Sequence, residues 1–100
     1  MKPRFVNVGE SEVVKTTNAG AKNADFIHRK VVYQGRRGAP DDWYFGHGGR
    51  LIIVEHKRPG KKPDPHQVKE IERLRERGFD VRVVSTVAAA KRLFEIESII

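Results

Sequence analysis

Two carboxylates and a lysine occupy positions where a strand hairpin would bring them together. Asp41 follows a proline, and Glu55 and Lys57 lie two residues apart at the end of the apolar run 51–54. Residues two apart on a strand point to the same face, so Glu55 and Lys57 are expected to share one side. Charged side chains in an apolar strand are costly to bury unless they are paired or bind a metal ion. This run is therefore a candidate site for chemistry.

Carboxylate oxygens are suitable ligands for Mg²⁺ and Mn²⁺, which also accept phosphate oxygens. A hairpin sets the start of its first strand beside the end of its second, so we expect Asp41 to lie near Glu55 and Lys57. A divalent ion there would lower the pKa of a bound water and neutralise charge developing on a phosphate. Lys57 would orient that water or stabilise the phosphorus centre as a point charge. The set predicts metal-dependent hydrolysis of phosphodiesters.

A plainer interpretation of the same residues is structural. Glu55 and Lys57 would then form an ion pair at a strand end, and Asp41 would cap a turn. The neighbouring Asp42 is expected to be solvated, and the ring of His56 is expected to point away from the face of Glu55. The four histidines (His28, His47, His56 and His66) do not have the spacing of a zinc site.

Hydrophobic periodicity and turn residues predict the elements that would position these side chains. Strands are expected at 26–33, 43–45, 50–57 and 79–84, and helices at 10–22, at 65–77 after an Asp64 cap, and after a cap at Ser85 or Thr86. The segment 47–49 is expected to turn a hairpin. The order helix, three strands, helix, strand, helix predicts an α/β fold with a mixed sheet flanked by helices. The last strand would run parallel to strand 50–57 after a helical crossover.

Composition limits the class of protein. One hundred residues suggest one small domain spanning 1–100, and 20 Lys+Arg against 13 Asp+Glu give a net charge of +7. Such a basic chain indicates a polyanionic partner, although a merely solvated basic surface is the alternative. The absence of cysteine excludes disulfides, thiolate zinc sites and cysteine nucleophiles. The first residues lack the apolar core of a signal peptide, so a soluble cytoplasmic protein is expected.

The spacing of these motifs resembles a known class of enzyme. Pro40-Asp41 and Glu55-His56-Lys57, with Glu55 fourteen positions after Asp41, resemble the PD-(D/E)XK nuclease motif. With the preceding Gly35-Arg-Arg-Gly-Ala and with Gln67, the pattern is similar to the VRR-NUC family (virus-type replication-repair nucleases) over about residues 35 to 95. The family includes small stand-alone phage and bacterial proteins. The resemblance implies a restriction-endonuclease-like αβββαβ core and a location in a bacterial or phage-infected cell.

The resemblance also implies roles for individual residues. Asp41 and Glu55 would ligate Mg²⁺ or Mn²⁺ together with the backbone carbonyl of His56. Lys57 would be the catalytic lysine, and Gln67 would support the site. A further ligand is implied on the first helix, where Glu10 and Glu12 both remain candidates.

Cations in the loops and an apolar C-terminus suggest partners. Arg36, Arg37, Lys61 and Lys62 flank the expected site and are predicted to contact DNA phosphates, with solvated loop charge as the alternative. No base-reading helix or zinc finger is evident, so recognition by DNA shape is expected. The segment 93–100 is more apolar than a small core requires, which suggests an interface. The resemblance implies a homodimer arranged in the manner of Holliday-junction resolvases.

The leading interpretation is a Mg²⁺- or Mn²⁺-dependent, structure-selective DNA endonuclease acting on branched DNA such as Holliday junctions. The first alternative is a non-catalytic DNA-binding module on a nuclease fold. The second is a basic structural protein whose acids balance local charge.

Overall fold

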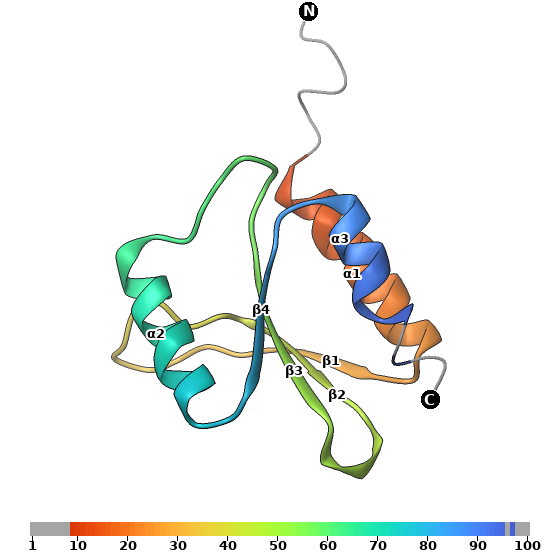
Figure 1. Cartoon of the computed structure of the whole chain (residues 1–100), viewed down its shortest axis with the longest axis horizontal. Helices are drawn as coiled ribbons and strands as arrows, with labels where there is room; N and C mark the ends of the chain where they lie inside the picture. Colours follow the sequence, from red (N-terminus) through yellow and green to blue (C-terminus); the bar gives the residue numbers. More distant parts are fainter. Residues whose placement is uncertain (1–8, 96, 98–100) are drawn as a thin grey trace, which may run out of the picture.

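A four-stranded sheet with helices on both faces forms the structure, which is a computed structural model describing residues 9–95 and 97 (Figure 1). The elements in chain order are α1 (Glu10–Asn23), β1 (Ile27–Lys30), β2 (Asp42–Phe45), the 3₁₀ turn η2 (His47–Gly49), β3 (Leu51–His56), α2 (Pro65–Glu76), β4 (Asp80–Val84) and α3 (Val87–Leu93). The spatial order of strands is β1-β2-β3-β4. Only β3 and β4 are parallel within this sheet, so the expected mixed α/β architecture is confirmed.

The register of β2 against β3 determines which side chains meet. Asp42 pairs with Val54, so Asp41 lies one position beyond the ladder, level with Glu55. Alternation along β3 sends Ile53 and Glu55 toward α2, and sends Val54 and His56 toward α1 and α3. The two faces of one strand end therefore carry different polar groups.

Each face of the sheet has its own apolar core. The core on the α1 and α3 face is the larger, and its buried apolar residues are Val13, Ala21, Tyr44, Ile52, Val54, Val84, Ala90, Leu93 and Phe94. The α2 face has a smaller cluster of buried residues, namely Ile53, Ile71 and Val81. Apolar burial is the dominant stabilising term in folding, so the α1 and α3 face supplies most of the stability. The thinner α2 face is the one that carries Glu55.

Helix α2 begins where the sequence predicts. The Asp64 carboxylate accepts from the Gln67 backbone N–H at 3.0 Å, and the Gln67 side-chain oxygen accepts from the Asp64 N–H at 2.9 Å. This reciprocal capping box satisfies two N–H groups that a helix start would leave unpaired, and Pro65 follows at the first helical position. The box also fixes Gln67, whose amide nitrogen remains available for another partner.

Two predicted elements need comment. Strand β1 ends at Lys30 rather than at 33, because its partner β2 has only four residues; Val31 donates one more bond to Asp41 O at 2.8 Å, and Val32 is 83% exposed. Thr86, rather than Ser85, caps α3 by accepting from the Ala89 N–H. Residues 96 and 98–100 of the predicted interface segment lie outside the described residues. Within the described part of the chain, no helix is long and apolar enough to cross a membrane.

Candidate active site

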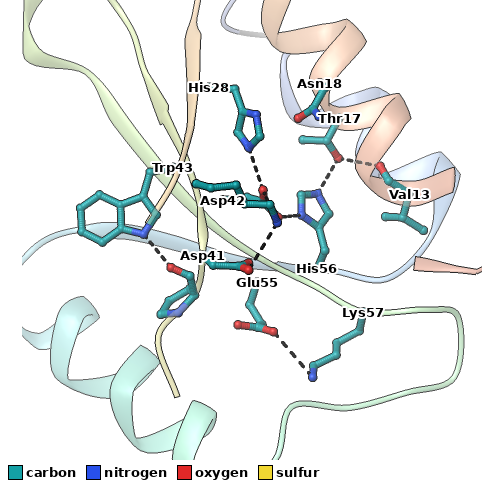
Figure 2. A network of polar contacts seen from close by, with 12 residues as sticks. Val13, Thr17, Asn18, His28, Asp41, Asp42, Trp43, Glu55, His56 and Lys57 are labelled. Atoms are coloured by element: carbon teal, nitrogen blue, oxygen red, sulfur yellow. Dashed lines mark hydrogen bonds and ion pairs between the residues drawn. The ribbon is translucent and has the colours of Figure 1, made fainter. Parts of the chain in front are cut away.

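The end of β3 and the residue before β2 bring the predicted carboxylates together (Figure 2). Glu55 is 5% exposed, whereas the Asp41 side chain is half exposed. Lys57 Nζ lies 3.6 Å from Glu55 Oε2, and the side-chain amide of Gln67 donates to the same oxygen at 3.1 Å. The structure thus gathers the four predicted site residues from two strands and one helix.

One oxygen of this site has no partner. Among the described residues, Glu55 Oε1 is the only buried side-chain nitrogen or oxygen without a hydrogen bond. Burial raises the pKa of Glu55 to about 7; Lys57 opposes the shift, and the negative charges of Asp41 and Glu10 add to it. A buried acceptor without a partner is costly, so Oε1 has the chemistry of a cation ligand that faces a second carboxylate.

The charge of Glu10 bears on the open choice between Glu10 and Glu12. Glu10 is exposed at the start of α1, and its charge is among those that raise the pKa of Glu55. Figure 1 shows the start of α1 at the same end of the molecule as the loop that follows β3. This favours Glu10. Among residues 9–95 and 97, however, no three or more Asp, Glu or His side chains gather closely enough to bind a metal by themselves.

Asp42 is not solvated, contrary to the sequence-based expectation. It is 1% exposed, and on the α1 and α3 face His28 Nε2 and His56 Nδ1 each approach it at 2.7 Å. Lys30 Nζ lies between the two aspartates, 3.0 Å from Asp42 and 3.3 Å from Asp41. Burial alone would raise the pKa of Asp42, but the hydrogen bonds from His56, His28 and Lys30 outweigh it and hold that pKa well below its usual range.

The ring of His56 completes a buried polar network on this second face (Figure 2). Its Nε2 lies 2.9 Å from Thr17 Oγ1, and Thr17 in turn donates to the Val13 carbonyl at 3.0 Å. The ring therefore points away from Glu55, as predicted. The network as a whole was not foreseen, although strand alternation from Asp41 to Asp42 was an available signal.

The four predicted DNA-contacting cations lie in two separate loops and are all exposed. Arg36 and Arg37 are in the loop between β1 and β2, where they line a hollow together with residues of α2. Lys61 and Lys62 are in the loop between β3 and α2. The two pairs therefore approach the site from different segments.

Comparison with known proteins extends the similarity beyond the motif. No protein-family model matches this chain. The chain is 35% identical over 79 residues to "Putative nuclease p44" of Acyrthosiphon pisum secondary endosymbiont phage 1, which spans 79% of this chain and 85% of that protein. It also resembles a solved structure described as "VRR_NUC domain", with a TM-score of 0.80 and 38% sequence identity over 86% of this chain and 94% of the other. The likeness therefore covers most of each chain.

Proposed function

Because this chain belongs to the VRR-NUC nuclease family, we propose that it is a metal-dependent DNA endonuclease that hydrolyses phosphodiester bonds in branched DNA. The observation that carries the metal dependence is Glu55 Oε1, a buried carboxylate oxygen without a partner among the described residues. The half-exposed carboxylate of Asp41 at the same strand end supports it. Two such oxygens suit Mg²⁺ or Mn²⁺.

The chain's own residues divide the work. Asp41 and Glu55 would hold the ion together with the backbone carbonyl of His56, and Glu10 is the favoured further ligand. A bound ion of this kind supplies a water of lowered pKa and neutralises charge on the phosphate. Gln67 engages Oε2 of Glu55, which leaves Oε1 for the ion. Lys57 adds a fixed positive charge that stabilises the negative charge growing on the phosphate during attack.

Metal binding is tested by thermal unfolding without any substrate. Millimolar Mn²⁺ or Mg²⁺ should raise the melting temperature, because an ion that binds only the folded protein stabilises it by about 2.7 kcal/mol at one hundred times its Kd. Asp41→Asn and Glu55→Gln should abolish the rise. Asp25→Asn changes an exposed carboxylate that contacts His47 of η2, and it should preserve the rise in melting temperature. An equal rise in all four proteins would place the ion elsewhere.

Cleavage tests the activity itself. Linear, nicked, flap, replication-fork and four-way-junction DNA should be compared with and without metal, and the branched substrates should be cut first. Asp41→Asn and Lys57→Met should remove most of the activity. Cleavage by these variants at the parent rate would overturn the site assignment. DNA binding without cleavage of any substrate would instead favour a non-catalytic DNA-binding module.

We also propose that the enzyme acts as a homodimer in the cytoplasm of a bacterial or phage-infected cell. Exposed apolar side chains on several elements support an interface, among them Phe45, Phe79 and Val83. Two copies would present two sites to the two strands of a branched substrate. Light scattering at micromolar concentration should give the mass of two chains, and the mass of one chain would contradict the dimer.

A further inference from the structure

A basic hollow lies beside the candidate active site, where the loop between β1 and β2 meets α2. Its volume is about 320 Å³, and its lining residues are Gly35, Arg36, Arg37, His66, Lys69 and Arg73. Four of these six carry a permanent positive charge, and no carboxylate is among them. The hollow therefore has the charge and openness of an anion site.

A buried carboxylate behind the hollow orients two of its arginines. Glu70 is 7% exposed, and its Oε1 lies 3.6 Å from Arg36 Nε and 3.5 Å from Arg73 Nη1. The hydroxyl of Tyr33 donates to Glu70 Oε2 at 2.7 Å. Both arginine side chains remain about half exposed, at 54% and 49%. Glu70 thus holds one edge of each guanidinium and leaves the rest for a ligand.

A close backbone contact fixes the loop against the helix. Gly38 has a φ of +89°, and a Cβ there would lie 2.7 Å from the carbonyl oxygen of His66. The loop that carries Arg36 and Arg37 is therefore seated on the first turn of α2. The next residue of that turn, Gln67, donates to Glu55. The hollow and the active site thus share one rigid support.

We propose that this hollow binds a backbone phosphate of the DNA substrate beside the site of cleavage, and that Tyr33 and Glu70 are positioning residues for its arginines. This rests on the proposed function for the identity of the polyanion. Held arginines lose less side-chain freedom when they meet a phosphate, so the hollow is preorganised. The loop that carries Arg36 and Arg37 ends at Asp41, so a phosphate bound in the hollow would align the DNA with the active site.

Equilibrium DNA binding in EDTA tests the hollow without cleavage. Lys69→Gln and Arg73→Gln should weaken binding to a four-way junction, and each should lower the slope of log K against log salt by about 1. The matched controls are Lys91→Gln and Arg92→Gln, which change exposed cations of α3 on the other face of the sheet. Salt slopes that fall equally in the hollow variants and the α3 controls, or in neither, would refute phosphate binding in the hollow.

The positioning role has its own readout. Glu70→Gln removes a negative charge next to two arginines of the hollow, so charge alone predicts tighter binding. Loss of positioning predicts binding weaker by about threefold to tenfold, because the arginines must then be ordered on binding. Tyr33→Phe leaves the charge unchanged and should also weaken binding without lowering the salt slope. Tighter binding by Glu70→Gln, or unchanged binding by Tyr33→Phe, would overturn the role, and thermal unfolding of both variants verifies that they fold.

These outcomes separate the hollow from the proposed activity. If the parent cuts DNA with metal but the hollow variants bind like their controls, phosphate binding in the hollow is refuted and the nuclease activity stands. If the parent cuts no DNA while Lys69→Gln and Arg73→Gln selectively lose binding, the nuclease activity is refuted and phosphate binding in the hollow stands.

Discussion

At the scale of single residues, the buried carboxylate of Glu55 destabilises the fold when it is ionised, which is the form that would bind a metal ion. Its pKa is raised from 4.5 to about 7, chiefly by burial, so between these pH values the folded protein binds more protons than the unfolded chain. Protonated Glu55 therefore contributes to the free energy of unfolding, and this contribution is fully present below pH 4.5 and is lost as pH rises through about 7. The shift corresponds to about 3 kcal/mol.

Denaturant unfolding in EDTA should show this loss directly. The parent should be less stable at pH 8 than at pH 5, and the difference between the parent and Glu55→Gln should move in favour of the variant as pH rises. Excess Mn²⁺ should restore the parent at pH 8, because a cation satisfies the ionised carboxylate. A parent and variant whose stabilities follow the same pH dependence would contradict a raised pKa for Glu55.

The adjacent pair Asp41 and Asp42 offers a second prediction at this scale. Asp42→Ala should cost about 3 kcal/mol or more, because it leaves the polar groups of His56 and His28 without their buried partner. Asp41→Ala should change stability by no more than about 0.5 kcal/mol, because its side chain is half exposed. Asp41→Ala should nevertheless abolish the response to metal. Chemical denaturation measures the stability costs of the two variants. Equal costs would contradict the placement of Asp41 and Asp42 in different environments.

The sequence was enough to predict that the candidate metal ligands and Lys57 lie together at this strand end. Asp41, Glu55 and Lys57 could be related through hairpin geometry and alternation, which are local properties. Alternation could place Asp42 on the other face, but the partners in its network could not be predicted, because they need the pairing of β1 for His28 and the packing of α1 for Thr17. Those partners lie 14 and 39 residues from the residues that they contact.

At the scale of elements, the contact between the β1–β2 loop and α2 holds the loop that ends at Asp41 against the helix that carries Gln67. Gly38→Ala would place a methyl group 2.7 Å from a backbone oxygen at a φ of +89°. We expect a cost of at least about 2 kcal/mol, since left-handed strain and a clash with backbone add.

Gly60→Ala is the matched control for this prediction. Gly60 has a φ of +82° with no atom within 4 Å of an added Cβ, so it carries only the conformational cost of roughly 1 kcal/mol. Thermal unfolding compares the two variants. Equal losses would mean that the loop moves away from α2 without penalty.

The ends of elements also show where sequence patterns are limited. Residues 26–33 are rich in β-branched and aromatic residues, as a longer strand would be, yet β1 is as short as its partner β2 permits. Pairing length is a property of two segments, whereas composition describes one. Helix α2, in contrast, was predictable at its start because its capping box is contained within four residues.

At the scale of the whole molecule, the two layers differ in strength. Within residues 9–95 and 97, the apolar core on the α1 and α3 face has nine buried residues, whereas that on the α2 face has three. We therefore expect amide hydrogens of α2 to exchange faster than those of α1. Mn²⁺ should slow exchange in α2, because Gln67 couples this helix to Glu55. Mass spectrometry of exchanged peptides measures both effects, and faster exchange in α1 would contradict this ranking.

The opposite orientations of Asp41 and Asp42 have an evolutionary consequence. A change of length at this junction that shifts β2 by one residue against β3 would reverse which aspartate faces α2, so the buried partner of His56 and the candidate metal ligand would be disturbed in the same step. A lineage cannot then adjust this boundary gradually by small insertions. Substitution remains open to selection there, while changes of length do not, and the Pro-Asp-Asp junction should be a stretch of fixed length among functional descendants.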